Sequence, residues 1–119
     1  DCGHAGWFAP VAPVLDWAQA WLDLACGRPG PLPDAARRLT MVGPNGRTPG
    51  WDCPSAGGST GGGWSPKTFG HLGYTGTALW VDPERERAAV LLTNRTWPDG
   101  ADRGIANLRR HFFAWVAER

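Results

Sequence analysis

The most constraining feature of the sequence is the stretch of residues 69–95, which reads as three short strands joined by two tight turns. Residues 77–81 are β-branched, apolar or aromatic, which suits a pleated, packed surface. The run Asp-Pro-Glu-Arg at residues 82–85 predicts a type I turn, because proline at its second position already has the required φ. Residues 88–92 are apolar on both alternating faces, so we expect cover on both sides. We therefore predict an antiparallel β-meander at residues 68–94.

Helical patterns lie before and after the predicted meander. Apolar residues at helical spacing predict a first helix at residues 11–26 and a C-terminal helix at residues 101–117. Proline followed by aspartate predicts a short helix at residues 33–41. Residues 54–66 form a Gly- and Ser-rich loop, which we expect to be mobile unless something packs on it. These elements predict a single α/β domain of the α+β type, in which helices flank an antiparallel sheet of three or four strands.

The first predicted helix and the segment before the loop refine this picture. The helix has only a narrow polar face, formed by Asp16, Gln19 and Asp23, so we expect it to lie between other elements. Residues 50–53 predict a short strand, which would be the fourth of the sheet. On the C-terminal helix, the apolar face predicted to point inward consists of four residues: Ile105, Leu108, Phe112 and Val116.

The composition excludes several classes of function. The formal net charge is +1 and there is no basic block, so nothing predicts binding to nucleic acid or to an anionic membrane. No apolar run approaches the length of a membrane span, and the chain shows no targeting segment. The chain begins at Asp1 rather than at methionine, inside a motif, so we expect a fragment or a processed piece. These features are compatible with a cytoplasmic and with a periplasmic or secreted location.

Patterns for metals, cofactors and disulfides are absent. The cysteines have unrelated spacings and form no Cys-x-x-Cys pair, which favours buried thiols in a reduced compartment. The cysteines and the histidines also lack any zinc-ligand spacing. We therefore expect no metal and no cofactor. The residues concerned are Cys2, Cys26, Cys53, His4, His71 and His111.

Three short patterns imitate known motifs. Residues 57–61 spell Gly-x-Ser-x-Gly, but a nucleophile elbow needs a strand before it and a helix after it, whereas this run lies in a glycine-rich loop. Residues 61–68 resemble a phosphate-binding loop, yet Pro66 has no N–H to offer a phosphate. Residues 94–96 form a glycosylation sequon without a secretory context. We assign no function to these three patterns.

A fourth group of motifs is spread along most of the chain. It comprises Gly-His-Ala-Gly-Trp-Phe at residues 3–8, His-Leu-Gly-Tyr-Thr-Gly at 71–76, Asp-Pro-Glu-Arg at 82–85 and Thr-Asn-Arg at 93–95. The last three of these motifs resemble the third motif region of the serine β-lactamase and penicillin-binding superfamily, in particular the class C-like hydrolases and esterases. The motif at 3–8 and the C-terminal amphipathic helix agree with that branch. The Lys-Thr-Gly motif of these enzymes often reads His-x-Gly, and the register of the following turn favours 71–73 over Lys-Thr-Phe-Gly at 67–70. The resemblance implies a partial β-lactamase/transpeptidase-like fold.

The resemblance also implies roles for individual residues. His71 would replace the motif's cationic residue and orient a substrate carboxylate or assist proton transfer. Gly73 would let a substrate backbone lie close to the strand, and the backbone amide of Tyr74 would be one oxyanion-hole donor. Leu72 stands where the motif has a hydroxyl residue, which favours an esterase-like substrate. Further substrate-binding positions would be Thr75, Gly76 and His4.

The nucleophile of the resembled enzymes is missing from this chain. They need Ser-x-x-Lys, in which helical spacing holds the amine beside the hydroxyl, and a Tyr-x-Asn motif. The residue three positions after Ser55 and the one three positions after Ser59 are glycines, and the one three positions after Ser65 is a threonine. None of them is a lysine. The single tyrosine, Tyr74, is followed by Thr-Gly. We therefore expect the chain alone to be inactive.

Two functional hypotheses follow from these motifs. In the first, the chain is the C-terminal part of a serine hydrolase that acylates its serine with an ester, amide or β-lactam carbonyl and releases the acyl group to water. Its partners would be the missing N-terminal segment of the same enzyme and a small-molecule substrate. In the second, the chain is a non-catalytic binding or interaction module descended from that fold. An exposed tryptophan-rich face and a pocket without serine would favour the second hypothesis.

Overall fold

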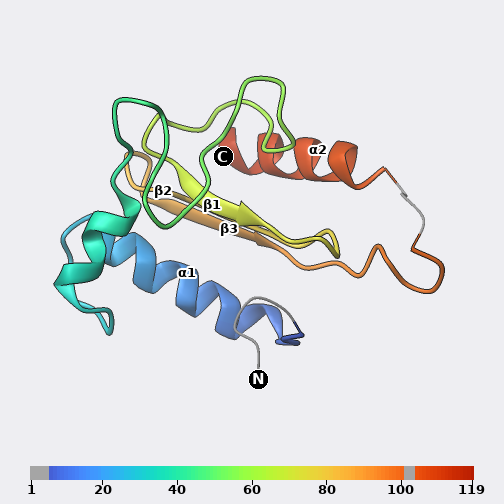
Figure 1. Cartoon of the computed structure of the whole chain (residues 1–119), viewed down its shortest axis with the longest axis horizontal. Coiled ribbons are helices and arrows are strands. Elements are labelled where there is room, and N and C mark those ends of the chain that lie inside the picture. Colours follow the sequence, from blue (N-terminus) through green and yellow to red (C-terminus); the bar gives the residue numbers. More distant parts are fainter. Residues whose placement is uncertain (1–5, 101–103) are drawn as a thin grey trace.

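A three-stranded antiparallel sheet lies between two helices in the computed structural model, which describes residues 6–100 and 104–119 (Figure 1). The strands are ordered β1-β2-β3, and α1 and α2 cover opposite faces of the sheet. The expected α+β class with helices flanking the sheet is confirmed. In chain order the elements are α1 (Val11–Ala25), the 3₁₀ helix η1 (Asp34–Thr40), β1 (Phe69–Leu72), β2 (Ala78–Asp82), β3 (Arg87–Leu91) and α2 (Ile105–Ala117).

The central strand β2 explains why the sheet carries a helix on each face. All five of its residues are buried, and consecutive side chains of a strand point to opposite faces. Leu79 and Val81 belong to the cluster under α1, whereas Trp80 packs with Phe113 of α2. One strand therefore connects two separate hydrophobic cores.

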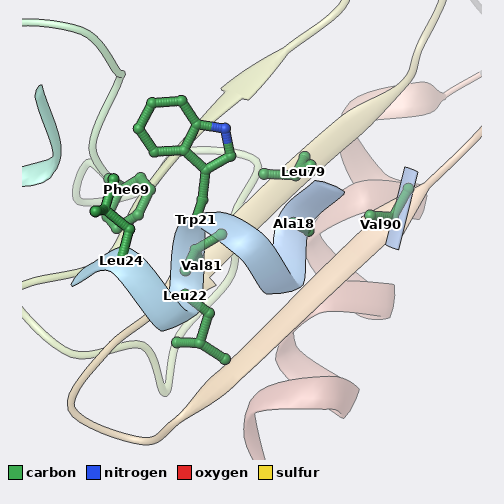
Figure 2. Close-up of a cluster of buried hydrophobic side chains, with 8 residues drawn as sticks. All are labelled: Ala18, Trp21, Leu22, Leu24, Phe69, Leu79, Val81 and Val90. Atoms are coloured by element: carbon green, nitrogen blue, oxygen red, sulfur yellow. The ribbon is translucent and has the colours of Figure 1, made fainter. Parts of the chain in front are cut away.

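The core on the α1 side is the larger of the two. Ala18, Trp21, Leu22 and Leu24 of α1 pack against side chains of all three strands (Figure 2). A chain of aromatic rings continues this core toward the sheet edge, with centroids 5.1 Å apart between Trp21 and Trp51 and 5.7 Å apart between Trp51 and Phe69. Such edge-to-face and tilted pairs add about 0.5–1.5 kcal/mol each to the effect of burial.

The Gly-rich loop of residues 54–66 packs on α2 rather than standing free. A side chain at Gly61 would run into the Arg110 carbonyl oxygen at 2.6 Å, so the glycine permits a close approach of the backbone. The Trp64 ring packs edge-on against Phe113, with centroids 6.1 Å apart. The loop therefore covers part of the second core.

Two expectations about the elements need correction. The strand expected at residues 50–53 amounts to an isolated bridge between Asp52 and Gly70, because the nearby Pro54 has no N–H for a ladder. On α2, Leu108 is 49% exposed, while Arg109 beside it is buried. The inward face runs through every fourth residue from Ile105, and it therefore includes an arginine.

The remaining expectations concern helix ends, cysteines and membrane spans. The 3₁₀ helix is shorter than the helix expected at 33–41, and residues 101–103 of the expected C-terminal helix lie outside the described residues. Cys26 and Cys53 are free thiols and half-buried, whereas Cys2 lies outside the described residues. No helix within 6–100 and 104–119 is long and apolar enough to cross a membrane.

Candidate active site

The His-Leu-Gly motif lies at the end of β1, which is an edge strand of the sheet. His71 is exposed and lies on the same face as Phe69, the face that α1 covers, because strand side chains alternate. Leu72 points to the other face and packs against the α2-side core. The strand thus presents a histidine to solvent on one side and anchors itself with a leucine on the other.

The turn that follows the motif is held by a buried arginine of α2. The Nη2 atom of Arg109 donates hydrogen bonds to the carbonyl oxygens of Gly73 at 2.6 Å and Thr77 at 2.8 Å. Its Nε donates to the Gly76 carbonyl oxygen at 3.0 Å. One guanidinium therefore holds three carbonyls of the five-residue turn 73–77.

Residues after β3 hold the other two carbonyls of the turn. The Nε of Arg95 donates to the Tyr74 carbonyl oxygen at 2.7 Å, and its guanidinium lies 4.8 Å from the centre of the Tyr74 ring. The Thr75 carbonyl oxygen accepts from the Arg95 backbone amide at 3.0 Å and from the Thr93 hydroxyl at 2.8 Å. All five carbonyl oxygens of residues 73–77 therefore accept hydrogen bonds from other residues of the chain.

The amides of the same turn behave differently. The N–H groups of Tyr74 and Thr75 donate to no acceptor among the residues that the structure describes. Both residues are exposed, and Tyr74 reaches 79%. Two successive free amides in an exposed turn are the arrangement that binds anions in proteins. They lie directly after the motif glycine.

The glycines of the motif are required by the turn itself. A Cβ atom at Gly73 would overlap the Thr77 hydroxyl, so the close approach that demands glycine is made within the turn. Gly76 has a φ of +97°, and a Cβ there would overlap the Thr93 hydroxyl and lie 2.9 Å from Ile105 Cδ1. The close contact of Gly73 with a substrate backbone stays a prediction, next to this structural requirement.

The electrostatics of the site are dominated by two cations. Burial lowers the pKa of the Arg109 guanidinium, and the nearby charge of Arg95 lowers it further. Arginine nevertheless stays protonated in proteins, so both side chains carry their charge. Within the described part of the chain, no carboxylate lies within 4.0 Å of Arg109, and backbone carbonyls alone stabilise the charge.

A cavity of about 260 Å³ lies next to the turn. Two of its lining residues, Thr93 and Arg95, also donate hydrogen bonds to carbonyls of the turn. No residue that lines the cavity is a serine. Elsewhere in residues 6–100 and 104–119, no group of three or more His, Cys, Asp or Glu could hold a metal ion. The cavity is lined by Thr93, Asn94, Arg95, Ile105 and Leu108.

The sequence-derived site residues 71–76 are consecutive in the chain, and the structure places His71 and Leu72 on opposite faces of the sheet, with the turn directly after them. His4 lies outside the described residues. Residues 57–61 lie in the loop, with no strand before them and no helix after them.

The sequence interpretation missed Arg109, Arg95 and Thr93. The signal for Arg109 was its place four residues after Ile105 and four before Phe113, inside an apolar helical stripe. For Arg95 and Thr93, no local pattern indicates contact with a turn some twenty residues earlier.

With this geometry in place, the comparison with known families is informative. The family model described as Beta-lactamase matches residues 3–112. The chain belongs to the Beta-lactamase family. The match covers α1, the whole sheet and the first part of α2, so the origin of the chain lies among the serine hydrolases of that family. Comparisons with curated proteins and with solved structures find no significant match.

Proposed function

We propose that this chain forms one wall of the active site of a β-lactamase-family serine hydrolase, with the nucleophile supplied by another segment. The observation that carries the proposal is the Tyr74 amide. It belongs to an exposed residue, donates to no described residue, and follows directly after the motif His71-Leu72-Gly73. An amide in that place suits the oxyanion of a tetrahedral intermediate, which needs preorganised donors about 2.7–3.1 Å away.

The chemistry divides between this chain and the missing nucleophile. A serine activated by a lysine attacks the substrate carbonyl, and the electron pair of the C=O bond moves to the oxygen. The Tyr74 amide donates to that oxyanion, and the amide of the nucleophilic serine is the second donor. His71, exposed on the α1 face of the edge strand, orients a substrate carboxylate or assists proton transfer.

The substrate class follows from the position of Leu72. Its side chain is apolar and packed against the α2-side core, so it offers no hydroxyl to a substrate carboxylate. A β-lactam or D-alanyl peptide would lose that hydrogen bond, whereas a simple ester does not need it. The position of Leu72 supports the proposal of an esterase-like, class C-related protein that acts on small esters more readily than on β-lactams.

Hydrolysis assays test this function directly. The chain is assayed with p-nitrophenyl acetate and with nitrocefin, alone and co-expressed with the segment encoded upstream in its gene. We expect ester hydrolysis only in the co-expressed form. Hydrolysis by the chain alone would contradict the proposal, and Ser59 would then be the first residue to replace.

A matched pair of variants tests the role of His71 in the active form. We expect His71→Ala to lower kcat/KM about 100-fold, within the range typical of general acid–base groups. The control is His111→Ala, because His111 is another exposed histidine, on α2 and outside the motif. Equal activity of the two variants would remove His71 from the mechanism.

A second candidate function rests on the apolar surface around the start of α1. Trp7, Phe8, Val11, Leu15 and Trp17 are all exposed, and the cavity beside the turn contains no serine. Exposed apolar clusters of this kind mark interaction sites. A non-catalytic interaction module would hydrolyse neither substrate in either preparation, and replacing Trp7 and Phe8 by serine would abolish its association with the upstream segment.

A further inference from the structure

The peptide group between Gly73 and Tyr74 is held through its carbonyl oxygen. Its carbonyl oxygen accepts from Arg109 Nη2 at 2.6 Å and from the Gly76 amide at 3.0 Å, so both lone pairs are used. In a trans peptide the N–H points opposite to the C=O. The Tyr74 amide therefore points away from Arg109. The arginine on α2 thus sets the direction of an amide that it does not touch.

The charge of Arg109 is the second part of the argument. The residue is 8% exposed and has no carboxylate partner among the described residues. A neutral donor would be enough to tie a turn to a helix, and burying an unpaired charge is costly. Here the charge lies against the carbonyl side of the 73–74 peptide. It polarises that peptide and makes its N–H a stronger donor, because hydrogen-bonded groups in series strengthen one another.

Arg87 shows what a purely structural arginine looks like in this fold. Its Nη1 donates to the carbonyl oxygens of Val116 and Ala117 at 2.9 and 2.7 Å, at the C-terminal end of α2. Carbonyls in the last turn of a helix lack the usual partner four residues on. The Val116 oxygen also accepts from the Arg119 amide at 3.3 Å, and Arg87 adds a donor to both carbonyls. Arg87 and Arg109 both tie α2 to the sheet hairpins, but only Arg109 reaches the motif turn.

We infer that Arg109 is a positioning residue for the Tyr74 amide, fixing the direction of this N–H and strengthening it as a donor to an anion. The inference deepens the proposed function and rests on it, since that function makes the Tyr74 amide the oxyanion donor. Arg109 acts through the peptide group and has no contact with the substrate. Arg95, bound to the next carbonyl, acts in the same way on the Thr75 amide.

Hydrogen exchange of the Tyr74 amide, measured by NMR on the full chain, tests the inference. Base-catalysed exchange removes the amide proton and leaves a negative charge, which a nearby cation stabilises. We expect the wild-type Tyr74 amide to exchange about tenfold faster than in an unstructured peptide of the same sequence, the size of effect for one charge in a partly solvated medium. Arg109→Met should slow it toward the peptide rate, with Arg95 still near the turn, and Arg109→Lys should give an intermediate rate.

Unfolding of the turn would also bring the Tyr74 amide to the peptide rate, so the Arg109→Met rate is compared only where the other amide signals of the variant keep their wild-type positions. Arg87→Met is the matched control, and we expect it to leave the Tyr74 rate unchanged. A wild-type rate at or below that of the peptide would overturn the inference even if Arg109→Met fails to fold. Equal Tyr74 exchange rates in wild type and Arg109→Met would also overturn it. So would a change of the Tyr74 rate in Arg87→Met as large as in Arg109→Met.

The exchange measurement is independent of catalysis. If the co-expressed enzyme hydrolyses nothing while the Tyr74 rate depends on Arg109, the proposed function fails and the positioning effect stands. If hydrolysis occurs and the Tyr74 exchange rate does not depend on Arg109, only the positioning role fails. In the active form, Arg109→Lys should lower kcat about tenfold with KM unchanged, as expected when an interaction is made only in the transition state.

Discussion

The hydroxyl of Ser65 donates a hydrogen bond of 2.6 Å to the carboxylate of Asp82, which is 0% exposed. The same carboxylate accepts from the backbone amides of Ser65, Glu84 and Arg85 and from Arg85 Nη1. It therefore ties the end of the Gly-rich loop to the β2–β3 turn. A buried carboxylate needs such donors, since an unpaired one would not stay ionised.

Removing the Ser65 hydroxyl should destabilise the fold. We expect Ser65→Ala to lower the free energy of unfolding by about 1–3 kcal/mol, because a buried charged acceptor loses a partner. Ser55→Ala is the matched control, since Ser55 is exposed in the same loop, and its effect should stay within about 0.5 kcal/mol. Urea unfolding followed by tryptophan fluorescence gives both values. Equal midpoints for the two variants would show that the Ser65–Asp82 bond contributes nothing.

Asp82 should also make the stability of the fold depend on pH. Burial raises the pKa of its carboxyl, but the bonds from Ser65 and Arg85 outweigh this and lower the pKa below its ordinary value. A carboxyl with a lowered folded-state pKa contributes stability above its unfolded value of about 3.9, and this contribution is lost as the pH falls toward the folded-state pKa. We expect the free energy of unfolding to fall between pH 5 and 3, as measured by urea titration.

Asp82→Asn is the variant that isolates this effect. It should be less stable at neutral pH and should lose less stability between pH 5 and 3 than the wild type. Asp34→Asn, at an exposed carboxyl, should keep the wild-type pH dependence. A pH dependence in Asp82→Asn as steep as in the wild type would assign the acid sensitivity to other carboxyls.

The sheet was predictable because its signals are local. The apolar run that became β2 and the Asp-Pro turn after it depend on neighbouring residues only, and Asp82 and Arg87 pair across that turn in the structure. The first helix was predictable for the same reason, since its apolar period is continuous. The motif at His71 is a contiguous string of residues, so sequence alone indicates it, and its catalytic role stays a prediction.

The support behind the candidate site was not predictable. Arg109 was assigned to neither face of its helix, since a charged residue inside an apolar stripe is normally solvated. Its burial depends on three carbonyls of a turn more than thirty residues earlier in the chain. The packing of the Gly-rich loop likewise depends on contacts with α2, which no local pattern encodes. A local sequence pattern does not show which distant residues will contact it in the fold.

Substitution of Gly76 should strain the motif turn. Gly76→Ala places a Cβ at a φ of +97°, against the Thr93 hydroxyl and Ile105, so we expect a loss of about 2–4 kcal/mol from backbone strain and overpacking. Gly46 has a φ of +70° with no atom within 4 Å of an added Cβ. Gly46→Ala should therefore cost only about 1–2 kcal/mol. Thermal unfolding compares the two, and an equal cost would mean that the turn can move away from Thr93.

The two faces of α1 should respond differently to the same substitution. Leu22 is 2% exposed in the core under the sheet, whereas Leu15 on the same helix is 40% exposed. Leu22→Ala leaves a cavity and should cost about 2–5 kcal/mol of unfolding free energy. Leu15→Ala removes a side chain that solvent already reaches, so we expect a loss of less than about 1 kcal/mol. Both helix propensities change alike, because the substitution is the same, so the difference reports packing alone. Urea unfolding of the two variants gives this difference directly.

A loss at Leu15 as large as at Leu22 would mean that the outer face of α1 is covered in solution, for instance by self-association through Val11 and Trp17. The unfolding midpoint of the wild type would then rise with protein concentration.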